Sequence, residues 1–148
     1  MIAPVSKGIN IFSGEAGLGG ALTNPTVLAR RKGCITQGYP VTVHGKQYPD
    51  VEAAYHALAT GDVAADDQLM HNLISQKFLS HPRLQAEVTR RGGTNFLAAC
   101  SHFTKATSAG GQAWEGQGTA SRFIRNLIIG YELSLKGEAA HLGQTALF

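Results

Sequence analysis

Apolar residues recur at three- and four-residue steps through much of the chain after residue 50, which is the spacing of one face of an α-helix. One stripe follows Asp62 and consists of Leu69, Met70, Leu73, Ile74 and Phe78. A longer one begins near Thr119, ends at Lys136-Gly137 and carries Phe123, Ile124, Leu127, Ile128, Tyr131 and Leu135. Both stripes predict helices that pack against a common core.

Shorter helices are predicted between and before these stripes. Residues 51–60 form one, with Asp50 placed to cap its first turn, and Asp62 is placed to cap the next. Pro82 suits the first turn of a third helix that ends at Gly92-Gly93, and Thr94 is placed to cap a short helix through Cys100.

The first fifty residues have a different pattern, with short β-leaning pieces separated by glycine and proline. We expect strands at residues 9–13, 26–29 and 40–44, and a hairpin that turns at His44-Gly45. The predicted fold class is therefore α+β, a helix-dominated single domain with a small antiparallel sheet near the N-terminus. The domain is expected over residues 1–137, followed by a tail at residues 138–148.

Composition agrees with one soluble domain. Of 148 residues, 43% are hydrophobic and 16% are charged, and the formal net charge of +3 suits an anionic ligand without requiring a nucleic acid. We expect Cys34 and Cys100 to be free thiols in a reducing cytosol. The chain lacks a signal-peptide pattern and any apolar run of membrane-spanning length, so a cytoplasmic location away from membranes is predicted.

Several classes of site are excluded by the spacing of reactive residues. The six histidines are scattered singly, so we expect no metal site, and no other cofactor is predicted. No phosphate loop ending in Gly-Lys-Ser/Thr and no Gly-x-Ser-x-Gly elbow is present, and Cys100-Ser101-His102 is too local to pair a nucleophile with its base.

Four short motifs remain, in a fixed order. They are Leu22-Thr23-Asn24, then Gly45-Lys46-Gln47-Tyr48-Pro49-Asp50-Val51-Glu52, then Gln76-Lys77-Phe78, and then Trp114-Glu115-Gly116-Gln117-Gly118. In this order the chain resembles the NADAR family over about residues 9–132, and the Tyr-Pro-x-Val-Glu segment is the most specific part of the likeness.

The resemblance implies an N-glycosidase. Such an enzyme would cleave the N-glycosidic bond of an ADP-ribosyl or related ribose-phosphate substrate, either an ADP-ribosylated guanine base or a riboflavin-pathway-like intermediate. The partner would be a small molecule or ADP-ribosylated nucleic acid. Breaking a base–ribose bond develops positive charge on the sugar, which a carboxylate stabilises. Glu52, at a helix start where a negative charge is favoured, is the predicted catalytic residue.

The predicted ligand-binding residues surround this carboxylate in the sequence motifs. Asn24 is expected to bond ribose hydroxyls, and Trp114 to stack on a base or else to fill the core. Backbone groups at a helix start and nearby side chains are expected to seat phosphate. The full set is Asn24, Lys46, Trp114, Gly116, Gly118, Ser121 and Arg122.

The chain also departs from the family pattern. Pro25 follows the first motif where many members have Phe, Ala53 replaces the usual His, and residues 56–59 contain no counterpart of a family lysine. These departures keep two alternatives open. One is a non-catalytic module that binds ADP-ribose or a related nucleotide, and the other is an interaction protein that retains only the scaffold.

Overall fold

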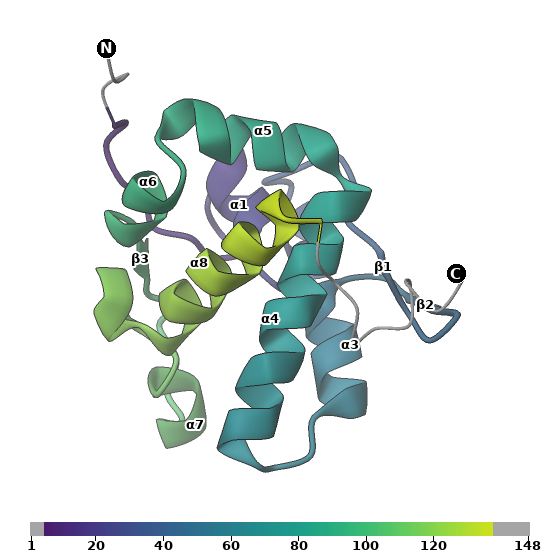
Figure 1. Cartoon of the computed structure of the whole chain (residues 1–148). Helices are drawn as coiled ribbons and strands as arrows, with labels where there is room; N and C mark the ends of the chain where they lie inside the picture. Colours follow the sequence, from purple (N-terminus) through teal and green to yellow (C-terminus); the bar gives the residue numbers. More distant parts are fainter. Residues whose placement is uncertain (1–4, 138–148) are drawn as a thin grey trace.

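The computed structural model describes residues 5–137, and they form a helix-dominated α+β fold (Figure 1). The predicted tail at residues 138–148 lies outside the described residues. In chain order the elements are α1 (Leu18–Leu22), α2 (Thr26–Arg31), β1 (Val41–Val43), β2 (Lys46–Tyr48), α3 (Val51–Leu58), α4 (Val63–Ser80), α5 (Pro82–Arg91), α6 (Thr94–Ala98), β3 (Ser101–His102), α7 (Ala109–Gln112), β4 (Gly116–Gln117), the 3-10 helix η1 (Gly118–Ala120) and α8 (Arg122–Leu135). None of the helices within residues 5–137 combines the length and apolar character that a bilayer span requires.

The long helices α4 and α8 cross at the centre of the molecule and pack on each other more extensively than any other pair of elements (Figure 1). Gly130 allows this close crossing, because a Cβ atom there would lie 2.5 Å from Cγ2 of Ile74. The predicted stripes supply the core around the crossing, and its largest buried side chains include Phe78 and Tyr131, whose rings meet edge to face. Leu135, predicted on the buried face of α8, is instead 55% exposed.

The capping predictions for α3, α4 and α5 are confirmed. Asp50 accepts a hydrogen bond from the Ala53 amide, Asp62 accepts one from the Ala65 amide, and Pro82 begins α5. The capping prediction for Thr94 is wrong: Gly93 precedes α6, and the Thr94 hydroxyl donates to Glu132 on α8.

The predicted hairpin is confirmed as an antiparallel pair, β1 with β2, in which Val41 lies opposite Tyr48. His44 and Gly45 both have positive φ, at 49° and 82°, which is the geometry of a tight turn that matches strand twist. A second antiparallel pair, β3 with β4, was not predicted.

Two predicted strands are wrong. Residues 26–29 belong to α2, because Pro25 starts a short helix in which Leu28, Ala29 and the following arginines favour helix over the β-branched pair at its start. Residues 9–13 form only a single bridge, between Asn10 and Ser101. The glycine-rich stretch between these two segments contains a helix, α1, that was not predicted.

Candidate functional site

One pocket of about 480 Å³ gathers residues from segments far apart in the sequence. Its wall comes from Ser13, from α2 and the loop before it, from α3, α4 and β3, from the segment around α7, and from the start of α8. The residues that line it are Ser13, Thr23, Asn24, Pro25, Leu28, Lys32, Glu52, Tyr55, His56, Met70, His102, Thr104, Gly110, Gly111, Trp114 and Phe123. Three predicted site residues, Asn24, Glu52 and Trp114, therefore share one cavity.

Glu52 reaches the pocket from the first turn of α3. The Asp50 cap fixes where this helix begins, and the Glu52 amide donates to the Asn24 carbonyl at 3.3 Å, which ties the helix to the loop that carries Asn24. The Glu52 side chain is 41% exposed, and its Oε2 lies 2.8 Å from Nε2 of His56, one turn further along. A negative charge at this position is favoured by the helix dipole.

Asn24 presents a buried acceptor that lacks a partner. Its side-chain amide donates to the sulfur of Met70 at 3.3 Å, and its Oδ1 has no hydrogen-bond partner although the residue is only 6% exposed. A buried oxygen without a donor costs free energy, so such groups in folded proteins call for an explanation. Asn24 is one of the residues that line the pocket, so this unpaired acceptor belongs to its wall.

Trp114 is held in the wall from two sides. Its carbonyl accepts hydrogen bonds from the Ser121 hydroxyl at 2.6 Å and from the Phe123 amide at 3.3 Å. The edge of Tyr55 meets the indole at a centroid distance of 5.7 Å, and the guanidinium of Arg122 lies 3.9 Å from the indole centroid. The indole is therefore partly buried and fixed in place, which is the arrangement a stacking surface needs.

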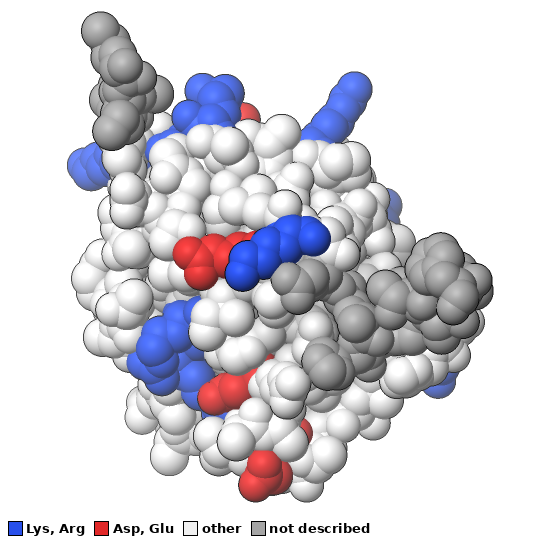
Figure 2. All heavy atoms as spheres, in the orientation of Figure 1, with Lys and Arg blue, Asp and Glu red and all other residues white. Residues whose placement is uncertain are grey.

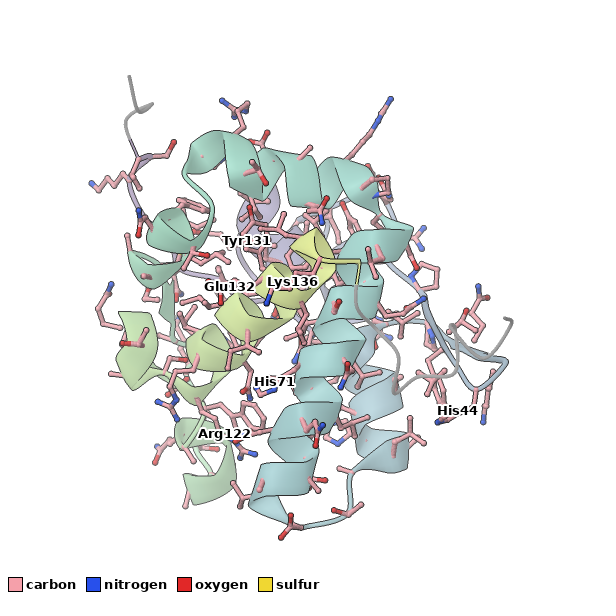
Figure 3. The ribbon with its side chains drawn as sticks, viewed as in Figure 1. His44, His71, Arg122, Tyr131, Glu132 and Lys136 are labelled. Atoms are coloured by element: carbon pink, nitrogen blue, oxygen red, sulfur yellow. The ribbon has the colours of Figure 1, made fainter. Side chains whose placement is uncertain are left out.

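Arg122 is in turn positioned by a polar network between α4 and α8. Its Nε donates to Asp67 at 2.8 Å, and Asp67 also accepts from the Asn126 amide at 3.0 Å. Nε2 of His71 lies 2.7 Å from Oδ1 of Asn126, and Figure 3 shows His71 between the two helices and Arg122 at the start of α8. Burial raises the pKa of Asp67, but the bonds from Asn126 and Arg122 outweigh this and hold it below its usual value.

The predicted phosphate seat before α8 does not line this pocket. The Gly118 amide donates to the Cys100 carbonyl at 2.8 Å, and Gly116 pairs with His102 in the β3–β4 ladder. Ser121 is fully buried and uses its hydroxyl to cap the Ile124 amide and to bond Trp114. These three residues hold the local backbone, and none of them lines the pocket.

Lys46 is also outside the pocket. It lies exposed on β2, with its ammonium 5.1 Å from the ring centroid of Tyr48. The lysine of the third sequence motif, Lys77, is 2% exposed and donates to the Thr23 carbonyl at 2.8 Å, so it supports the loop that carries Asn24. Burial lowers the pKa of Lys77 to about 7, although the nearby Asp50 charge acts in the opposite direction.

Two polar residues of the pocket, Lys32 and His102, were not among the predicted site residues. Lys32 is the one Lys or Arg among the described lining residues, and its Nζ donates to the Ser13 hydroxyl at 2.7 Å. His102 stacks on Phe123 at a centroid distance of 4.4 Å. Lys32 belongs to the only run of three basic residues, and His102 to the Cys-Ser-His segment, but neither pattern predicted that its residue would line the same pocket as Glu52.

Comparison of the chain with protein-family models, with curated proteins and with solved structures gives no match. The resemblance to the NADAR family therefore stays a prediction. Within residues 5–137, no group of three or more His, Cys, Asp or Glu side chains is placed to hold a metal ion.

Proposed function

We propose that this protein is an N-glycosidase that hydrolyses the bond between a base and the ribose of an ADP-ribosyl or related ribose-phosphate substrate. The observation that carries the proposal is the shared pocket, in which the Glu52 carboxylate and the Trp114 indole line the same cavity. A carboxylate and an aromatic surface are the two groups that this reaction needs most, one for the sugar and one for the base.

The reaction develops positive charge on the ribose ring. As the bond from C1′ to the base nitrogen breaks, its electron pair leaves with the base, and a water oxygen forms the new bond to C1′. The Glu52 carboxylate would stabilise the positive ring in the transition state, which is the form of catalysis that contributes most in charge-developing reactions. The departing base would take up a proton from solvent.

Substrate placement follows from the other lining residues. The unpaired Oδ1 of Asn24 would accept a hydrogen bond from a ribose hydroxyl, and Trp114 would stack on the base. Lys32 would meet a phosphate oxygen, because its ammonium is held by a neutral hydroxyl rather than a carboxylate. This places phosphate at the α2 end of the pocket instead of at the start of α8.

On one face of the molecule, the charge distribution favours a small molecule over a large polyanion. On the face drawn in Figure 2, Lys and Arg side chains lie in small separate groups, with Asp and Glu side chains among them. That face offers no continuous positive surface of the kind that binds a nucleic-acid backbone.

A Glu52→Gln variant tests the proposal. It keeps the shape of the side chain and removes its charge, so ADP-ribose binding measured by calorimetry should stay within about threefold of wild type while base release falls by at least about 100-fold. Glu132→Gln, on the exposed face of α8, is the matched control and should release base at the wild-type rate. Base release by the Glu52 variant at the wild-type rate would contradict the role given to Glu52.

A second candidate is a module that binds ADP-ribose without cleaving it. It is favoured by the engagement of Glu52 Oε2 with His56, which offsets the carboxylate charge whenever His56 is protonated. Such a module would give heat of binding with ADP-ribose but would release no base from an ADP-ribosylated guanine oligonucleotide or from an N-ribosyl 5′-phosphate. An interaction protein with neither property is the third outcome of the same pair of assays.

A further inference from the structure

His102 lies in the pocket wall with its ring fixed in orientation. It sits on β3, which is paired with β4, and its imidazole stacks on Phe123 with the two planes 33° apart. Its Nδ1 lies 2.7 Å from the Ile11 carbonyl oxygen. A carbonyl only accepts, so Nδ1 carries the proton and donates it.

This hydrogen bond determines what the other ring nitrogen can do. In the neutral imidazole with a proton on Nδ1, Nε2 has a free lone pair. Within the described residues His102 makes no second side-chain hydrogen bond, and its side chain lines the same cavity as Glu52 and Trp114. An imidazole that is fixed in orientation and has an unprotonated nitrogen free to accept a proton can act as a general base.

We propose that His102 is the general base of the hydrolysis, a role that rests on the proposed N-glycosidase function. Nε2 takes a proton from the attacking water while the water oxygen bonds to C1′, and the C1′–N bond breaks with its electron pair going to the base. The imidazolium then returns its proton to solvent. Glu52 and His102 thus have different roles: the carboxylate stabilises the positive charge on the sugar, and the imidazole activates the water.

The surroundings keep His102 available as a base at neutral pH. Burial lowers the pKa of the imidazole, while the Ile11 bond and the carboxylates of Glu115 and Glu52 act in the opposite direction. The charges that act on the ring are those of Glu115, before β4, and Glu52, on α3. The other titratable residues that line the same pocket are Tyr55 and His56 on α3 and Lys32 after α2, whereas α8 contributes the uncharged Phe123. Activity should therefore fall only at a pH below the ordinary histidine value of about 6.5.

Two variants separate proton transfer from structure. His102→Asn keeps an amide donor near the position of Nδ1, so the Ile11 bond can remain, and it removes the pocket nitrogen. His102→Gln places an amide near the position of Nε2 that can bond water but cannot take its proton. His44→Asn is the matched control, because His44 is exposed at the hairpin turn, away from Arg122 and α8 (Figure 3), and its φ of 49° suits Asn.

The assay follows base release from an ADP-ribosylated guanine oligonucleotide and from an N-ribosyl 5′-phosphate across a pH series, with ADP-ribose calorimetry beside it. We expect both His102 variants to bind ADP-ribose within about threefold of wild type, to lose at least about 100-fold in kcat, and to lose the acid limb of the wild-type pH profile. Wild-type kcat with an intact acid limb in His102→Asn would overturn the role of His102 and leave the proposed function standing. A wild-type protein that turns over neither substrate would overturn both.

Discussion

Asn24 is the residue whose surroundings most directly suggest a ligand. Its Oδ1 is buried without a partner, and its amide has only a thioether sulfur as acceptor, so the folded protein gains little from this polar side chain. Both features are expected of an amide that is retained for binding a ligand. Replacing this side chain should therefore change the stability of the fold little but weaken the binding of the ligand.

Asn24→Leu should therefore leave the free energy of unfolding within about 1 kcal/mol of wild type, since an apolar side chain of similar size removes an unsatisfied group. Affinity for ADP-ribose should fall about tenfold, the value of one hydrogen bond from a ribose hydroxyl. Urea unfolding and calorimetry measure the two quantities. A destabilised variant with unchanged affinity would assign Asn24 to the fold alone.

Lys77 makes stability depend on pH in a defined direction. Its pKa is about 7 in the folded protein and about 10.5 in an unfolded chain, so between these values the unfolded chain binds a proton that the folded protein has released. Stability contributed through this group therefore rises as pH increases from about 7 to about 10.5. At lower pH the folded protein carries the full cost of a buried ammonium.

Lys77→Met should remove that contribution. We expect the free energy of unfolding to rise less between pH of about 7 and about 10 in the variant than in wild type. Relative to wild type, the variant should therefore be most stable at the lowest pH of this range. Urea unfolding of both proteins across this range measures the slopes. Identical slopes would show that Lys77 does not titrate in the folded protein as described.

Among the elements, the segment from β4 to the start of α8 holds the neighbouring backbone in place through its own hydrogen bonds. The residues beside this segment orient Trp114. Gly118 has a φ of 55°, and a Cβ atom there would lie 2.7 Å from the Ala98 carbonyl oxygen. Both constraints require glycine for reasons of packing. Two glycines before a helix are found both where the helix start binds phosphate and where packing requires glycine. Only the three-dimensional contacts distinguish these two roles.

Gly118→Ala should lower the free energy of unfolding by about 2 kcal/mol or more, while the folded fraction binds ADP-ribose as wild type does. Gly137→Ala is the control, because Gly137 has a similar φ of 72° but open space around its Cα, and it should cost only the backbone strain of about 1 kcal/mol. Lost affinity in a fully folded Gly118 variant would restore the phosphate role.

We expect Arg122 to act by holding Trp114 in place, because its guanidinium lies over the indole and its Nε donates to Asp67. Leu at this position removes both the guanidinium over the indole and its bond to Asp67, so the indole should move more freely. Because Trp114 is the single tryptophan, its fluorescence anisotropy reports this directly and should fall in Arg122→Leu, with ADP-ribose affinity lower by about threefold to tenfold. Arg125→Leu, exposed one turn away, should change neither quantity. Unchanged anisotropy in Arg122→Leu would refute the positioning role.

The elements themselves could largely be predicted where local rules decide them. The stripes of α4 and α8, the caps of α3 and α4, the Pro82 start of α5 and the turn at His44-Gly45 follow from periodicity, capping chemistry and backbone geometry within a few residues. The β3–β4 pair could not be predicted, because two-residue strands carry no periodicity and their pairing depends on contacts across the fold.

At the scale of the whole molecule, the pocket exists because the central α4–α8 crossing brings distant segments to one side. Glu52 and Asn24 are linked by a backbone bond between α3 and the loop before α2, whereas His102 and Trp114 arrive through β3 and the segment after α7. The residue motifs indicated Asn24, Glu52 and Trp114. Lys32 and His102 could not be predicted, because nothing local in their segments indicates which side chains lie across the cavity.

We propose that one cavity holds a ribosyl N-glycoside between Glu52, His102 and Trp114. A crystal structure of the protein with ADP-ribose would test this placement. We expect density in this pocket, with C1′ of the terminal ribose within about 3.5 Å of a Glu52 oxygen or of a water bonded to Nε2 of His102, and a phosphate beside Lys32. ADP-ribose bound elsewhere on the molecule, with the pocket containing only solvent, would contradict it.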